Sequence, residues 1–138
     1  MKEVPVGKAE ILLEGDTLAL ICLGPVTNRA LEAARDFPGR VGVFDFRFLK
    51  PIDTAALDGI ADRYAHILTL EDGSLKGGLY GAVCEHLACR RNRPVIEGAG
   101  IPDAFTVHAR QADQRRDCGL DKEGIAGRIA GILSGSKK

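Results

Sequence analysis

Short apolar runs alternate along the chain with longer segments in which apolar residues recur at helical spacing. The runs at 17–23, 41–46, 66–70 and 95–98 predict strands, and the first of them is apolar enough to be buried on both faces. The periodic segments predict helices that follow Gly24-Pro25, Asp53, the glycine-rich turn at 73–81, and Asp121. Thr27 or Asn28, Asp53 and Asp121 are the residues expected to cap three of these helices.

Strands that alternate with helices indicate an α/β fold. We predict a three-layer α/β/α arrangement around a mixed, mostly parallel sheet of about five strands, joined by right-handed crossovers. The segment 9–14 is expected to form a hairpin with 17–23 across the turn Glu14-Gly15-Asp16, which adds one antiparallel strand at an edge. Residues 1–138 are predicted to form a single domain with a frayed tail at 133–138.

Composition and charge argue against several classes of function. The chain has 19 basic and 19 acidic residues, so no net charge attracts nucleic acid or an anionic membrane. No apolar stretch is long enough for a membrane span or resembles a signal peptide, and we expect a soluble, cytoplasmic protein. The four cysteines form no Cys-x-x-Cys pair and are interpreted as buried or idle thiols.

The glycine-rich turn from Gly73 to Gly81 leads from a predicted strand into a predicted helix. Backbone amides at such a turn can hold a phosphate, but the spacing of a P-loop or of a dinucleotide fingerprint is missing. The simpler interpretation is that these glycines permit positive φ and the close approach of a helix or a neighbouring chain.

Charged residues follow the second and third predicted strands. Asp45 and Arg47 can contact a ligand at the carboxyl edge of the sheet, but a structural ion pair is the favoured interpretation. Glu71 and Asp72 can bind a metal or act as acid and base, although neighbouring strand residues point to opposite faces. For these two we favour a role in fastening loops or in an interface. His66, His86 and His108 lack the spacing of a zinc site, and no hydrolase or RNA-binding motif is present.

Three stretches in order along the chain resemble the C-terminal domain of the transketolase superfamily, most closely that of the 1-deoxy-D-xylulose-5-phosphate synthases. They are GKAE (7–10) with GDTLAL (15–20), then DFRFLKPID (45–53) with EDG (71–73) and GGLYG (77–81), and finally GIPDAF (100–105) with GLDKEGI (119–125). The last stretch is the one that transketolases and the beta components of 2-oxo acid dehydrogenases match less well. Tyr80 and Cys118 depart from the synthase pattern without disturbing the fold that it implies.

The resemblance implies a transferase that joins pyruvate to glyceraldehyde 3-phosphate with loss of carbon dioxide, for isoprenoid precursor and thiamine biosynthesis. In that family thiamine diphosphate and Mg²⁺ lie between the pyrophosphate- and pyrimidine-binding domains of a homodimer, and neither domain is present here. The resemblance therefore implies no catalytic, cofactor-binding or metal-binding residue in this chain, which is expected to be inactive alone. The residues expected to make interdomain or subunit contacts are Asp45, Arg47, Glu71, Asp72, Gly73, Gly77, Gly78 and Gly81.

Two alternative functions remain open at this stage. The chain can be the equivalent domain of a transketolase or of a 2-oxo acid dehydrogenase beta component. From a different class, it can be a stand-alone regulatory module that binds a small anion near 73–81.

Overall fold

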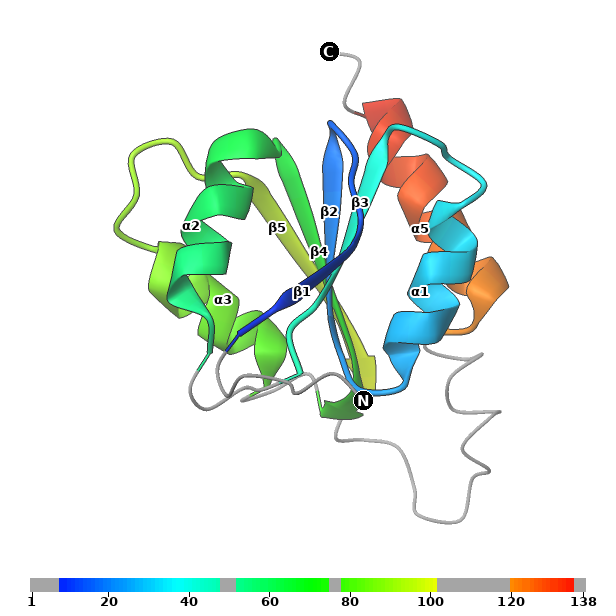
Figure 1. The fold of residues 1–138 in the computed structure, drawn as a ribbon, viewed down its shortest axis with the longest axis horizontal. Helices are drawn as coiled ribbons and strands as arrows, with labels where there is room; N and C mark the ends of the chain where they lie inside the picture. The colour runs from blue at the N-terminus through cyan, green and yellow to red at the C-terminus, as the bar shows by residue number, and fades with distance from the viewer. Residues whose placement is uncertain (1–7, 48–51, 75–77, 102–119, 136–138) are drawn as a thin grey trace.

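The computed structural model describes residues 8–47, 52–74, 78–101 and 120–135, and Figure 1 shows their arrangement. The elements in chain order are β1 (Glu10–Leu13), β2 (Leu18–Leu23), α1 (Val26–Ala34), β3 (Val41–Asp45), α2 (Thr54–Arg63), β4 (His66–Ser74), α3 (Leu79–Leu87), β5 (Val95–Ile101) and α5 (Lys122–Gly135). Helix α5 thus includes the first residues of the predicted tail, while 136–138 lie outside the described residues. No helix in the described part of the chain is long and apolar enough to cross a membrane.

The strands form one sheet in the order β1-β3-β2-β4-β5. Strands β3, β2, β4 and β5 are parallel, and β1 is antiparallel to β3, with Glu10 opposite Asp45. The predicted mixed, mostly parallel sheet is confirmed. The predicted hairpin between 9–14 and 17–23 is wrong, because β2 already pairs with β3 on one side and with β4 on the other. The first strand therefore joins the free side of β3.

Helices cover both faces of the sheet, as Figure 1 shows, with α1 and α5 on one side and α2 and α3 on the other. The predicted three-layer α/β/α arrangement is confirmed. Strand β2 belongs to both cores, since Leu18 and Leu20 pack under α1 and α5 while Ala19 and Ile21 pack under α2 and α3. A strand buried on both faces has a continuous apolar run rather than an alternating one, which explains its sequence.

Two of the three predicted helix caps are confirmed. The Asp53 carboxylate accepts the Ala56 N–H at 3.0 Å to begin α2, and Asp121 accepts the Gly124 N–H at 2.8 Å to begin α5. The prediction for α1 is wrong: the helix already begins at Val26, after Pro25. The hydroxyl of Thr27 donates to the Gly24 carbonyl at 2.7 Å instead of capping. Proline supplies the helical φ at this start without a side-chain cap.

Candidate functional site

The carboxyl ends of the parallel strands meet at one edge of the sheet, where open α/β folds place ligands. Because β1 runs antiparallel, its first residue lies at this edge too. We call this surface the carboxyl edge and define it by its charged side chains, Glu10, Asp45, Arg47, Asp53 and Glu71.

Arg47 binds two carboxylates at the carboxyl edge. Its Nη2 atom lies 2.8 Å from Glu10 Oε2, and its Nε atom lies 3.6 Å from Asp45 Oδ2. The Arg47 backbone N–H also donates to Asp45 Oδ1 at 3.1 Å, at a φ of 56° that non-glycine residues seldom adopt. The predicted Asp45–Arg47 ion pair is confirmed. The sequence did not predict the contact of Glu10 with Arg47, because that contact depends on the pairing of β1 with β3.

Glu71 fastens the end of β4 to the start of α3. Its buried carboxylate accepts the Leu79 N–H at 2.8 Å. Burial raises the pKa of Glu71, and the hydrogen bond from Leu79 opposes that rise only in part. A carboxylate thus occupies the helix N-terminus at which the anion-binding hypothesis placed a phosphate, and its charge repels a second anion. The loop-fastening interpretation of Glu71 is confirmed.

The structure describes two glycines at the α3 end of the 73–81 turn, and each lacks one of the features expected of them. Gly78 begins α3 with φ −101°, and no atom lies within 4 Å of the position that a Cβ of Gly81 would take. The expected positive φ is therefore wrong at Gly78, and no segment of the described chain approaches Gly81. Asp72 and Gly73 lie in β4, and Gly77 lies outside the described residues.

Asp53 holds the start of β1 against α2, in addition to capping that helix. Its Oδ2 atom accepts the Ala9 N–H at 2.8 Å. Burial acts to raise the pKa of Asp53, but the N–H groups of Ala9 and Ala56, together with the charge of Lys8, outweigh burial and lower it. Sequence reasoning identified the cap but not the link to Ala9.

The described residues offer no donor set for the Mg²⁺ that the family resemblance implies. No three His, Cys, Asp or Glu side chains come together in the described part of the chain. Two carboxylates of the carboxyl edge, those of Glu10 and Asp45, share the guanidinium of Arg47. No chemical step through a metal or thiamine diphosphate can be derived from these residues.

The cysteines and histidines form no metal-binding cluster within the described residues. Cys22 is buried in the core, where burial and then the charge of Asp45 raise the pKa of its thiol. His86 lies on α3 with its Nε2 atom 3.0 Å from Asp58 Oδ1 of α2, which is a surface contact between helices. Cys118 and His108 lie outside the described residues.

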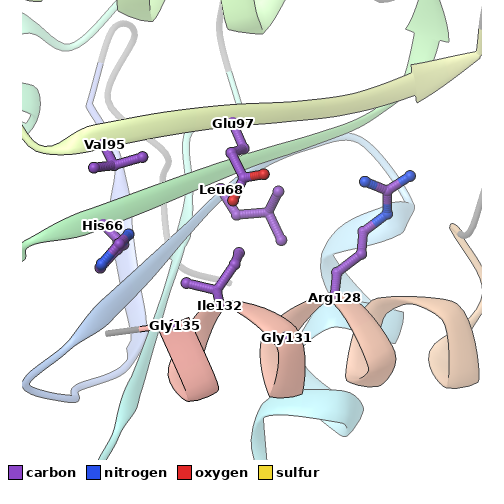
Figure 2. A pocket seen from close by; sticks show the side chains of 8 residues that line it. All are labelled: His66, Leu68, Val95, Glu97, Arg128, Gly131, Ile132 and Gly135. Carbon is purple, nitrogen blue, oxygen red and sulfur yellow. The ribbon is translucent and has the colours of Figure 1, made fainter. Parts of the chain in front are cut away.

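A cavity of about 370 Å³ lies away from the carboxyl edge, between the first residues of β4 and β5 and the last turns of α5 (Figure 2). Its lining residues are His66, Leu68, Val95, Glu97, Arg128, Gly131, Ile132 and Gly135. None of the residues that the sequence singled out for contacts lies in this cavity, so it is separate from the candidate site.

Comparisons with known proteins agree on one family. The model of the family "Transketolase, C-terminal domain" matches residues 7–125. The chain is 37% identical over 129 residues to the 1-deoxy-D-xylulose-5-phosphate synthase of Bacteroides thetaiotaomicron, and 40% identical over 129 residues to that of Bacteroides fragilis. It is also 40% identical over 132 residues to the synthase of Chlorobaculum tepidum. Each match covers 91% of this chain but only 20% of the relative.

A solved structure described as "Split gene transketolase, inactive beta4 tetramer" has the same fold. It superposes with a TM-score of 0.84 and 28% identity, over 96% of this chain and 44% of its own. The family model and the synthases thus match nearly the whole of this chain, which spans about a fifth of the length of the synthases. This chain belongs to the transketolase C-terminal domain family.

Proposed function

We propose that this chain is the C-terminal domain of a thiamine diphosphate-dependent 1-deoxy-D-xylulose-5-phosphate synthase, in which it organises domain and subunit contacts. The parent enzyme joins pyruvate to glyceraldehyde 3-phosphate and releases carbon dioxide. The observation that carries the proposal is 37–40% identity to such synthases across 91% of this chain and only a fifth of theirs. The remaining four-fifths of the parent bind thiamine diphosphate and Mg²⁺ and carry the catalytic residues.

The geometry of the carboxyl edge supports a role in contacts rather than in catalysis. Its cation and its carboxylates are bound to one another or to backbone N–H groups, so no described group there is poised to move a proton. Glu10 and Arg47 nevertheless keep 37% and 25% of their side-chain surface exposed. We assign this edge, together with Asp72 and the 73–81 turn, to contacts with the pyrophosphate- and pyrimidine-binding domains of a homodimeric parent.

The alternatives have weaker support. The split gene transketolase is 28% identical to this chain, less than the synthases, and this difference favours the synthase. The small-anion module is opposed by the buried Glu71 carboxylate at the start of α3.

A chimera tests the proposal. Residues 8–138 of this chain replace the matching C-terminal fifth of the Bacteroides fragilis synthase, and product formation is measured with thiamine diphosphate, Mg²⁺ and both substrates. We expect product from the chimera, and none from this chain alone or from the Bacteroides protein truncated before that fifth. A folded but inactive chimera contradicts the assignment to the synthase, and product from this chain alone contradicts the scaffold role.

A further inference from the structure

An apolar groove of about 220 Å³ lies between β1 and α2, on the side of the sheet that α2 covers. The apolar residues that line it, which define the β1–α2 groove, are Ala9, Ile11, Phe44, Ala56, Gly59 and Ile60. Neither the predicted contact residues nor the cavity in Figure 2 belongs to this groove.

Two residues show that the described chain leaves the groove unfilled. Ile11 is 55% exposed, which in the described part of the chain makes it one of the two exposed large apolar side chains. Gly59 lies inside α2, and no atom comes within 4 Å of the position that its Cβ would take. A glycine inside a helix costs about 1 kcal/mol relative to alanine. No described side chain or backbone segment packs against α2 so closely that position 59 must be glycine. A group from outside the described chain therefore has room to approach α2 at Gly59.

The position of the first strand indicates which partner fills the groove. The chain corresponds to a C-terminal domain, so the other four-fifths of the synthase relatives precede the matched region. That polypeptide would enter this domain next to Ala9, which lines the groove. The Ala9 N–H is held by the Asp53 carboxylate at 2.8 Å. A domain tethered so close to an apolar surface is present at a high effective concentration.

We propose that the β1–α2 groove is the docking surface for the preceding domain of the parent synthase, which places an apolar side chain against Ile11 and Gly59. This inference rests on the proposed function and adds to it a surface distinct from the carboxyl edge. Apolar anchors in a pocket contribute most of the energy of such contacts, and the surrounding polar residues contribute less. Arg63 also lines the groove, where it is paired with Glu14 at 3.7 Å and supplies a polar group.

Hydrogen exchange on the chimera described above tests the docking surface. We expect the amides of β1 and α2 to exchange at least about tenfold more slowly in the chimera than in this chain alone. The variant Gly59→Met fills the groove from within and should abolish this difference in the chimera. In the isolated chain the same variant should leave the melting temperature unchanged or raise it, because methionine favours helix over glycine.

Two further variants keep the test specific. Gly127→Met changes a glycine of α5 that is equally free of neighbours, and it should leave the protection of β1 and α2 intact. Ile11→Asp places a charge on an exposed position of the groove and should abolish the protection as Gly59→Met does.

The possible failures are distinguishable. An active wild-type chimera with no protection of β1 and α2, or with protection that survives both groove variants, overturns the docking surface and leaves the synthase assignment intact. An inactive chimera overturns the synthase assignment. If light scattering instead shows that this chain alone dimerises and that Gly59→Met makes it monomeric, while exchange in the chimera is unaffected, a second copy occupies the groove and the inference is wrong.

Discussion

Asp53 and Glu71 have opposite pKa shifts, although both are shielded carboxylates that accept backbone N–H groups at the start of a helix. Asp53 receives two such hydrogen bonds and lies near Lys8, so the pKa of its carboxyl group is lowered despite burial. Glu71 receives one from Leu79, which is too little to offset burial, so its pKa is raised. The balance between burial, which raises the pKa, and the nearby N–H donors and positive charge, which lower it, decides the sign.

The two shifts make opposite contributions to stability as the pH changes. The folded pKa of Asp53 lies below its unfolded value, so its contribution is present above the unfolded pKa and is lost as the pH falls through the folded pKa. The folded pKa of Glu71 lies above its unfolded value. The folded state therefore takes up a proton first on acidification, and Glu71 favours folding increasingly as the pH falls through its folded pKa.

The variant Glu71→Gln separates these contributions. Glutamine keeps an acceptor for the Leu79 N–H and removes the buried charge, so the variant should be at least as stable as the parent at about pH 7. Its advantage should shrink as the pH is lowered and Glu71 becomes protonated in the parent. Urea unfolding at a series of pH values measures this. The exposed Glu85→Gln on the same helix is the control, and an advantage that grows on acidification would contradict the assignment.

What the sequence could predict at the scale of residues depended on how local the interaction is. The caps at Asp53 and Asp121 were predictable because a side chain binds an N–H group three positions along the chain. The contact of Arg47 with Glu10 was not predictable, because these residues meet only after β1 has paired with β3.

At the scale of elements, β1 shows the limit of sequence patterns. The short turn before β2 is typical of a hairpin, but the apolar run of β2 is that of a central strand, which needs a neighbour on each side. The hairpin-like turn and the apolar run were both visible in the sequence. In the structure β2 takes the central position, between β3 and β4, so β1 does not pair with it. The identity of the second neighbour depended on contacts between distant segments, which no local pattern encodes.

The variant Arg47→Ala should loosen β1 without unfolding the domain. The ion pairs of Arg47 tie the first residue of β1 to the end of β3, and they are partly exposed, so we expect a loss of about 1 kcal/mol or less. The amides of Glu10–Leu13 should exchange faster than in the parent, by up to about fivefold. Arg63→Ala removes a pair that is more exposed and is the matched control. Unchanged exchange in β1 would show that Arg47 does not hold that strand.

At the scale of the whole molecule, the two cores are expected to unfold together because β2 belongs to both. Leu20→Ala and Ile21→Ala remove buried side chains from opposite faces of this strand, and each should lower the free energy of unfolding by about 2–5 kcal/mol. Both variants should retain one transition, with calorimetric and van't Hoff enthalpies that agree. Ile11→Ala, at an exposed position, is the control. A second transition in either core variant would contradict the coupling of the two faces.

The three-layer architecture was the part of the whole molecule most open to prediction. Alternation of apolar runs with helical segments is enough to predict an α/β sheet with helices on both faces. The strand order β1-β3-β2-β4-β5 was harder to predict. It depends on which of several possible neighbours each strand pairs with, and the sequence of a single strand does not specify that. The β1–α2 groove gave no sequence signal, since it is lined by residues from three separate segments.

The strand order also fixes a sequence of events during synthesis of the chain. Strand β1 is made first, yet its partner β3 begins only at Val41, and β2 lacks its second neighbour until the segment from His66 has been made. Pairing between distant strands must first overcome the entropy of closing the loop between them. A nascent chain that stops before His66, near the midpoint of the 138 residues, therefore carries its most apolar strand with one side bare. The unpaired side of β2 can then pair with a strand of another chain, and this self-association is prevented once β4 has been made and pairs with β2.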